Sequence, residues 1–192
     1  MSTRTSDDRR QELARIAYLT IIDSGIEGMT MRGVAERAGC TTGSIVHHFA
    51  DRSELLGAAL DYANAVAGMR LDKADDLGEW VTQSLPLSTE GAQQWRVWLS
   101  VWAQALSVPS IRNRHLEMYS IWHAAFVDRV REAQAAGIVR KDLDVALVAD
   151  HLMSVVDGVG MRATLDPDRW PEERQRALIA QALDAFVERS SD

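Results

Sequence analysis

Residues 30–49, TMRGVAERAGCTTGSIVHHF, contain two short helical patterns separated by a glycine, and this segment restricts the fold more than any other part of the chain. Thr30 predicts the start of the first helix, because its hydroxyl can accept a backbone amide hydrogen that has no partner within the helix. Val34 and Ala38 lie at helical spacing, and Gly39 follows where a residue in the left-handed conformation would end the helix. Two short helices joined in this way form a helix-turn-helix, whose second helix enters the major groove of DNA.

The second helix of this motif is expected to begin at Thr41 or Thr42 and to run to Phe49, with Ile45 on its buried side. Its first turn has short hydroxyl side chains, which suit phosphates and base edges, and a glycine, which lets the backbone approach DNA closely. The residues that this pattern places at the DNA are Thr41, Thr42, Gly43, Ser44, His47 and His48. For His47 the alternative is a surface residue without a role, and for His48 it is partial packing beneath the motif.

The net charge of −7 by itself disfavours nucleic acid as a partner. Residues 1–56 carry seven Arg and eight Asp or Glu, a net charge of −1, and residues 57–192 carry 14 basic and 20 acidic residues, a net charge of −6. Most of the acidity is therefore outside the motif. A nearly neutral DNA-binding domain is expected to bind modestly per copy and with a steep salt dependence.

The sequence lacks the features of exported and membrane proteins. The first residues, MSTRTSDDRR, have no apolar centre like that of a signal peptide, and no apolar run approaches the roughly 20 residues of a membrane helix. Cys40 is the single cysteine, so no internal disulfide is possible, and this favours a cytoplasmic location. Cys40 is interpreted as a buried core thiol, with a redox switch as the alternative.

Helical periodicity continues through the rest of the chain, and no strand-like alternation persists. We expect an all-α protein of about nine helices, with a three-helix helix-turn-helix DNA-binding domain over residues 1–52 and a helical-bundle ligand-binding and dimerisation domain over residues 53–192. A helix at about 53–70 connects the two domains. The other helices outside the motif are expected near residues 7–24, 74–85, 89–107, 110–136, 144–165 and 171–189.

Residues 13–60 resemble the N-terminal domain of the TetR family of bacterial transcriptional regulators. The matching positions occur in the family's order, and they are Gly25, Met29, Thr30, Met31, Arg32, Val34, Ala35, Ala38, Gly39, Thr41, Thr42, Gly43, Ile45, His47, His48, Phe49, Arg52, Leu55 and Leu56. The resemblance implies that Arg32, in the first helix of the motif, and Arg52, at the start of the helix after it, are cations placed against the DNA backbone.

Val46 departs from the family's pattern, which commonly has an aromatic residue at this position. In relatives a tyrosine there usually reaches a phosphate. This chain therefore either loses that contact or uses Val46 against a thymine methyl group.

The remainder of the chain resembles, more loosely, the C-terminal domain of the Bet-type subgroup, named for repressors of choline–betaine genes. The residues that carry this resemblance are Trp98, Leu99, Trp102, Ala103, Trp122, Gly137, Ile138, Val139, Val156, Asp157 and Gly158. The resemblance implies a homodimer that represses transcription from double-stranded operator DNA until a small molecule binds the C-terminal domain.

Aromatic residues recur at helical spacing along two successive helices of this C-terminal part. Such a stripe is either plain core or the wall of a ligand pocket between helices. Asp157 is either a hydrogen-bonding partner for a neighbouring element or a carboxylate within that pocket, where aromatic faces would suit a cationic, choline-like or polyamine effector. The residues of the candidate pocket are Trp98, Trp102, Tyr119, Trp122, Met153 and Asp157.

The last two helices are expected to form the dimer, with the alternative that their apolar stripes only close the core of the single chain. The stripe on the helix near 144–165 consists of Leu152, Val155, Val156 and Val159, with Gly158 and Gly160 allowing close approach. A twofold dimer would let two motifs bind one palindromic site, which raises affinity by linking two half-sites.

An enzyme and a helical interaction module that does not bind DNA are the two rival classes. The chain has no glycine-rich phosphate loop, nucleophile elbow or metal-spaced cluster, and the spacing of His115 and His123 does not suit a shared metal ion. We therefore expect no enzymatic activity, cofactor or metal. An interaction module would leave Gly39, Gly43 and the polar first turn without an explanation.

Overall fold

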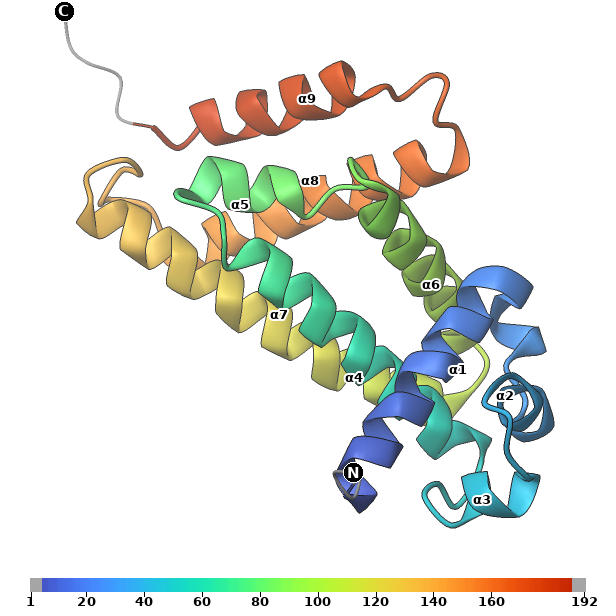
Figure 1. Ribbon diagram of the computed structural model, residues 1–192. Helices are drawn as coiled ribbons and strands as arrows, with labels where there is room; N and C mark the ends of the chain where they lie inside the picture. The colour runs from blue at the N-terminus through green and yellow to red at the C-terminus, as the bar shows by residue number, and fades with distance from the viewer. Residues whose placement is uncertain (1–4, 188–192) are drawn as a thin grey trace, which may run out of the picture. The chain divides into compact units, whose positions relative to one another are not determined.

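The computed structural model describes residues 5–187, and these residues form nine helices, so the all-α prediction is confirmed (Figure 1). The helices are α1 Ser6–Gly28, α2 Met31–Arg37, α3 Thr42–Val46, α4 Arg52–Leu71, α5 Leu77–Gln83, α6 Thr89–Ala105, α7 Pro109–Ala135, α8 Val145–Leu165 and α9 Glu172–Asp184. No helix in this part of the chain is both long enough and apolar enough to span a membrane.

The chain divides into two compact units. Among the described residues, unit 1 contains residues 5–69 and 96–115, and unit 2 contains residues 70–95 and 116–187. Three helices, α4, α6 and α7, thus contribute residues to both units. The functional boundary expected between residues 52 and 53 stays a prediction.

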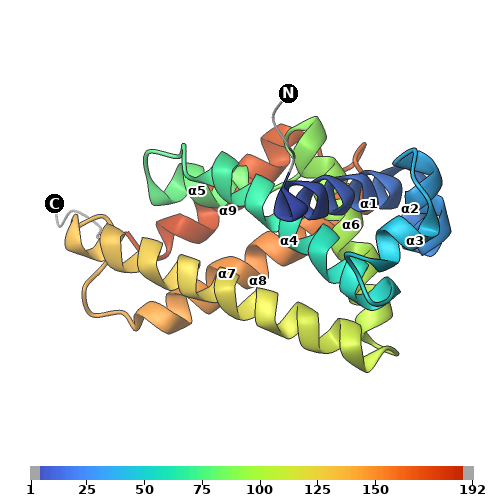
Figure 2. The same ribbon diagram turned by 60° about the horizontal axis from the view of Figure 1, so that its bottom comes forward.

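Unit 1 is built around one face of α1, against which α2 packs, with α3 packed on α2 (Figure 2). Leu13 and Ala17 from α1, Val34 from α2 and Ile45 from α3 are completely buried. The C-terminal part of α6 completes this core with Val97 and Val101. Burial of these apolar side chains is the main force that holds the short helices α2 and α3, since isolated helices of this length are not stable in water.

Unit 2 has its core between α5, α7, α8 and α9, and α9 packs against both α5 and α8 (Figure 2). Trp95 belongs to the part of α6 that lies in this unit, and it is 1% exposed. Its indole Nε1 donates a 2.9 Å hydrogen bond to the Ser84 carbonyl. The indole lies directly against Gly160 of α8. Trp95 is therefore fixed by both a polar and a packing contact.

Local capping signals explain several helix starts. The side chains of Thr30, Thr41 and Asp144 each accept a hydrogen bond from the amide three residues later, as N-cap residues do. Gly25 has a φ of 72°, which interrupts the regular helix within α1 at the position where the sequence predicts its end.

Three helices are shorter than the sequence predicts. Helix α3 ends at Val46 and not at Phe49, although the Phe49 amide still donates to the Ile45 carbonyl. Helix α5 begins only after Asp76, whose carboxylate caps it, and α9 ends at Asp184. The predicted end of the last helix, Arg189, lies outside the described residues.

The apolar stripe that the sequence assigns to a dimer on α8 is largely buried within the chain itself. Leu152, Val156 and Val159 are at most 6% exposed, and Gly160 is covered by Trp95. These residues are not available to a partner, so their assignment to the interface was wrong. Helical periodicity identifies an apolar face but does not tell whether the chain or a second copy covers it.

Candidate nucleic-acid interface and candidate effector site

The helix-turn-helix is fixed from its buried side. Gly39 has a φ of 63° and turns the chain between α2 and α3, a conformation that side chains disfavour. Ile45 and Phe49 are completely buried, and they set the rotation of α3 about its axis. As a result, Thr42, Gly43, Val46 and His47 are on the exposed surface, while Ser44 is half-buried.

The hydroxyl groups predicted to contact DNA differ in whether they already make a hydrogen bond within the chain. Thr41 Oγ1 accepts one hydrogen bond, from the Ser44 amide at 3.2 Å, so this hydroxyl already serves as the N-cap of α3. Thr42 is exposed on the first turn. Side-chain hydroxyls and free amides at this end of a helix suit phosphate oxygens or base edges.

Gly43 has no internal reason to be glycine. Its φ is not positive, and a Cβ built on it would meet only Thr41 Oγ1, at 3.7 Å. A glycine in a helix costs about 0.5–1 kcal/mol relative to alanine. Since packing within the chain does not require it, the absence of a side chain is useful only to something outside the chain that approaches α3 closely.

The predicted cations fall into two groups. Arg32 extends from α2 with its side chain 84% exposed, and its Nε is 2.8 Å from Glu36 Oε1 in an ion pair along the helix. Arg52, by contrast, points inward: its Nε and Nη2 donate to the carbonyls of Met29 and Ile26 at 2.8 and 2.5 Å. Sequence could not separate these two arginines, because their difference depends on the turn after α1.

The two histidines at the end of α3 are side by side, with ring centroids 5.1 Å apart. His47 is exposed and His48 is half-buried. Burial, followed by the charges of His47, Arg9 and Arg10, lowers the pKa of His48 below its ordinary value. His48 is therefore less readily protonated in the free chain than an ordinary histidine.

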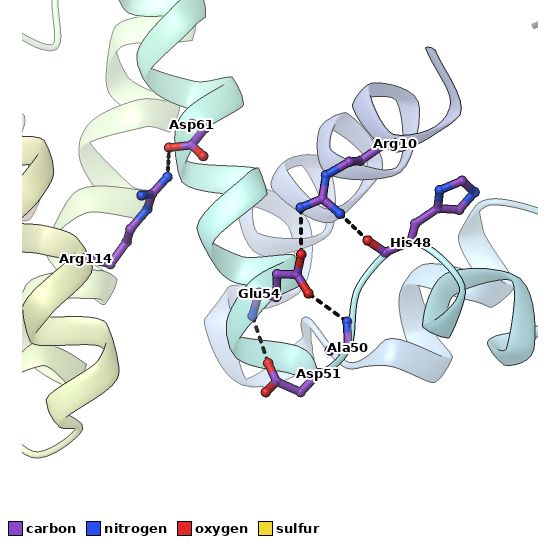
Figure 3. A network of polar contacts seen from close by, with 7 residues as sticks. All are labelled: Arg10, His48, Ala50, Asp51, Glu54, Asp61 and Arg114. Atoms are coloured by element: carbon purple, nitrogen blue, oxygen red, sulfur yellow. Dashed lines mark hydrogen bonds and ion pairs between the residues drawn. The ribbon is translucent and has the colours of Figure 1, made fainter. Parts of the chain in front are cut away.

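A polar network holds the segment after α3, and sequence reasoning missed it (Figure 3). Arg10 of α1 donates to the His48 carbonyl and to Glu54 Oε1, the latter at 2.8 Å, and its guanidinium lies 4.3 Å above the Phe49 ring. Glu54 Oε2 in turn accepts from the Ala50 amide at 2.7 Å. We call these four contacts of Arg10 and Glu54 the α1–α4 clamp.

Glu54 is held in its charged form within the clamp. The hydrogen bond from the Ala50 amide and then that from Arg10 lower the pKa of Glu54 below its ordinary value. The partners are 38 and 44 residues apart from Arg10, so no local sequence pattern could have predicted them. Elsewhere in unit 1, Asp61 of α4 pairs with Arg114 of α7 (Figure 3).

In unit 2, the structure brings two of the predicted pocket residues together. The Tyr119 hydroxyl of α7 donates to Asp157 Oδ2 of α8. Burial raises the pKa of the Asp157 carboxyl, and the hydrogen bond from Tyr119 opposes this rise. Burial and the hydrogen bond to Asp157 also raise the pKa of Tyr119. A half-buried carboxylate with a single neutral partner is a group that a cation would stabilise.

The other predicted pocket residues are less clearly joined to this pair. Trp122 is half-buried in unit 2 and packs near Trp80, with ring centroids 6.4 Å apart, while Met153 is buried in the same unit. Trp98 and Trp102 belong to unit 1, where Trp102 lies 6.1 Å from the His115 ring. A pocket formed by all six residues stays a prediction.

His123 and Asp150, also in unit 2, form a pair with 3.1 Å between Nε2 and Oδ1. Within residues 5–187, no group of three or more His, Cys, Asp and Glu side chains could hold a metal ion.

Comparison with known proteins gives the same pattern along the chain. Residues 17–59 match the family model "Bacterial regulatory proteins, tetR family", and residues 73–188 match "BetI-type transcriptional repressor, C-terminal". A curated relative, the HTH-type transcriptional regulator BetI of Stenotrophomonas maltophilia, is 26% identical over 92% of this chain and 91% of its own.

Two solved structures are similar over nearly the whole chain. A putative TetR-family transcriptional regulator from Rhodococcus sp. has a TM-score of 0.82 and 26% identity, and covers 95% of this chain and 100% of that one. A putative transcriptional regulator from Saccharomonospora viridis, in complex with choline, has a TM-score of 0.78 and 23% identity, and covers 96% of this chain and 100% of that one. At that identity, the second likeness shows the fold.

Proposed function

Because this chain belongs to the TetR family and is a DNA-binding transcriptional repressor with a BetI-type C-terminal part, we propose that it binds a palindromic operator as a homodimer and releases it when a small cation binds unit 2. The family is one of regulators and not of enzymes. The observation that carries the DNA-binding assignment is the exposed face of α3. On this face the packing of the chain leaves room for a side chain at residue 43, yet the residue is a glycine.

In this proposal, Arg32 and His47 contact phosphates, while Thr42 and Gly43 face the base edges. His48 and Ser44 make secondary contacts with the DNA. Thr41 contributes its backbone amide to the DNA contact, and its hydroxyl caps α3. Arg52 acts chiefly by fixing the turn after α1, since two of its nitrogens are used there. Phosphate contacts position a protein on any duplex, whereas base contacts specify sequence.

The proposal is tested by selecting bound fragments from the source genome and measuring affinity against salt concentration. We expect a palindromic site whose binding weakens steeply with salt, and a smaller salt slope for Arg32→Ala, by about 1 per half-site. The Arg32→Ala loss should be similar for all sequences. Failure to bind any neighbouring promoter fragment at low salt would contradict the function, and a change in base preference alone would contradict the assignment of Arg32.

Gly43→Ala should separate folding from DNA binding. We expect the variant to be as stable as the parent or more stable by about 0.5 kcal/mol, because alanine favours a helix and its Cβ would make only an ordinary contact of 3.7 Å with Thr41 Oγ1. Operator affinity should fall about tenfold or more, because the added methyl group stands where DNA approaches. Urea unfolding and a gel shift measure the two effects, and unchanged affinity would place the DNA elsewhere.

The homodimer is proposed on the exposed side of α8. Leu147, Met161 and Leu165 are 68%, 38% and 72% exposed and lie on one stripe of the helix with Ser154 and Gly158. A Cβ on Gly158 would meet nothing within 4 Å, so this position leaves room for a second helix to approach. A self-complementary stripe of this kind is what a twofold interface requires.

Met161→Glu is expected to disrupt this dimer without unfolding the chain, because an unpaired carboxylate cannot be buried at an apolar interface. Sedimentation should then give the mass of one chain, 21.3 kDa, with unchanged circular dichroism and a large loss of operator affinity. Leu106→Glu, which places the same charge at another exposed leucine, is the control and should remain dimeric. A wild-type chain that sediments as a monomer would contradict the proposal.

The effector is proposed to be a small cationic molecule that pairs with Asp157 beside Tyr119 and Trp122. The raised pKa of Asp157 means that its surroundings favour the protonated, neutral carboxyl group. A bound cation would instead favour the charged carboxylate, so cation binding and proton binding at Asp157 compete. Choline is the probe, since a structural neighbour was solved with it. Its affinity, measured by tryptophan fluorescence, should rise with pH in the wild type and not in Asp157→Asn, and the absence of any fluorescence change would count against the proposal.

The same raised pKa predicts how stability depends on pH. The folded chain keeps the Asp157 proton to a higher pH than the unfolded chain, whose aspartates titrate near about 3.9. The stabilisation by this proton is therefore complete below that value and is lost as pH rises through the folded pKa. The free energy of unfolding of the wild type should fall relative to Asp157→Asn over this range, and a constant difference would contradict the prediction.

A further inference from the structure

Within residues 30–49, Val46 is the one large apolar side chain that is exposed, with 53% of its surface accessible. Val34 and Ile45 are completely buried, and Met31 is partly buried against the core of unit 1. Val46 therefore does not contribute to the core of unit 1. Its exposure is not a consequence of loose packing, because Ile45 next to it fixes the orientation of the helix.

Val46 shares the exposed side of α3 with Thr42 and Gly43. Val46 lies one helical turn after Thr42 and three residues after Gly43, so these three residues are neighbours on the surface. Gly43 has no side chain, and a Cβ at this position would have only Thr41 Oγ1 within 4 Å, at 3.7 Å. Because valine is branched at Cβ, its side chain is nearly fixed in a helix and loses little entropy when a partner packs against it.

Valine cannot donate a hydrogen bond, so Val46 does not contact a phosphate or a base acceptor. The apolar group that the major groove offers is the 5-methyl group of thymine. We propose that Val46 packs against the 5-methyl group of one thymine in each half-site, with Gly43 leaving room for that base pair. This inference rests on the proposed function, and it adds a sequence requirement to the operator.

The test removes the methyl group from the DNA and its partner from the protein. Each thymine of the selected operator is replaced in turn by deoxyuridine, which differs only by the absent methyl group, and binding is measured for the wild type and for Val46→Ala. His47→Ala is the control, because it removes a neighbouring contact and leaves the valine. Val46 is exposed and alanine favours a helix, so the variant is expected to fold.

We expect one thymine in each half-site at which deoxyuridine weakens wild-type binding about fourfold, the value for one buried methyl group, and about fifteenfold when both symmetric thymines are replaced. Val46→Ala should show less than about half of this free-energy effect at that position, while His47→Ala should retain it in full. If no thymine shows the loss in the wild type, or if Val46→Ala shows the same loss, the inference is wrong. If the wild type binds no duplex at all, the proposed function fails first.

Discussion

Arg10→Met is expected to lower operator affinity about 30-fold, although Arg10 is on α1 and not on the helix that enters the groove. In the α1–α4 clamp, Arg10 joins the His48 carbonyl, the Phe49 ring and Glu54, and so holds the segment that follows α3. Without it, Phe49 is still buried, but the backbone on either side of it is held less tightly. DNA binding must then also order this segment in both chains of the dimer, and this cost reduces the observed affinity.

The size of the effect follows from which contacts are protected from water. The Arg10–Glu54 ion pair is 40% and 43% exposed, so screening leaves it a small contribution. The hydrogen bond to the His48 carbonyl and the contact with the Phe49 ring are more protected, and together we assign them about 1 kcal/mol per chain. Two chains on one operator give about 2 kcal/mol, which is about 30-fold in affinity.

A phosphate contact by Arg10 would also weaken binding, and two measurements distinguish it from positioning. Loss of a phosphate contact reduces the salt slope by about 1 per half-site, whereas loss of the clamp should leave the slope unchanged. Arg15→Met is the matched control, since Arg15 is an exposed arginine on the same helix, and it should change affinity little.

Glu54→Gln gives the sharper comparison. Removal of a negative charge near DNA should by electrostatics alone raise affinity. If Arg10 acts by positioning, Glu54→Gln should instead lower affinity, because it weakens the clamp that Arg10 completes. The Arg10→Met/Glu54→Gln double variant should lose less than the sum of the two single losses. Higher affinity for Glu54→Gln would contradict the positioning role.

The parts of this fold that sequence predicts are those governed by neighbours along the chain. Thr30 and Thr41 cap their helices through the amide three residues on, Gly39 has the positive φ expected of it, and Gly25 interrupts the helix after which it was expected. Each of these features depends on a few adjacent residues, so a local pattern contains the necessary information.

The parts that sequence does not predict depend on contacts between distant residues. The two arginines Arg32 and Arg52 look equivalent in the sequence, yet the first extends to solvent and the second donates to carbonyls of the turn after α1. On α8, both faces contain apolar residues, and contacts with residues far away in the sequence, such as that of Trp95 with Gly160, distinguish the buried face. A helical period fixes the angle between residues and not the direction in which the helix faces.

Gly160→Ala is expected to destabilise the chain by about 3 kcal/mol, which corresponds to a decrease of about 6–12 °C in Tm. A Cβ at Gly160 would lie 2.1 Å from Cζ2 of Trp95 and 2.3 Å from Cη2, distances that no packed structure tolerates. The indole cannot move aside freely, because it is 1% exposed and its Nε1 is hydrogen-bonded to the Ser84 carbonyl. The variant must therefore strain the core of unit 2 or break that hydrogen bond.

Two further variants establish that the cost arises at this contact. Gly68→Ala is the control within α4, where a Cβ would meet nothing within 4 Å, and it should leave stability unchanged or raise it slightly. The atoms that clash with residue 160 belong to the six-membered ring of the indole, so the shorter ring of Trp95→Phe should make room for the methyl group. Urea unfolding of the four combinations gives the coupling, and we expect Gly160→Ala to cost much less in the Trp95→Phe background than in the wild type. An equal cost in both backgrounds would mean that Gly160 is required for a reason other than the indole.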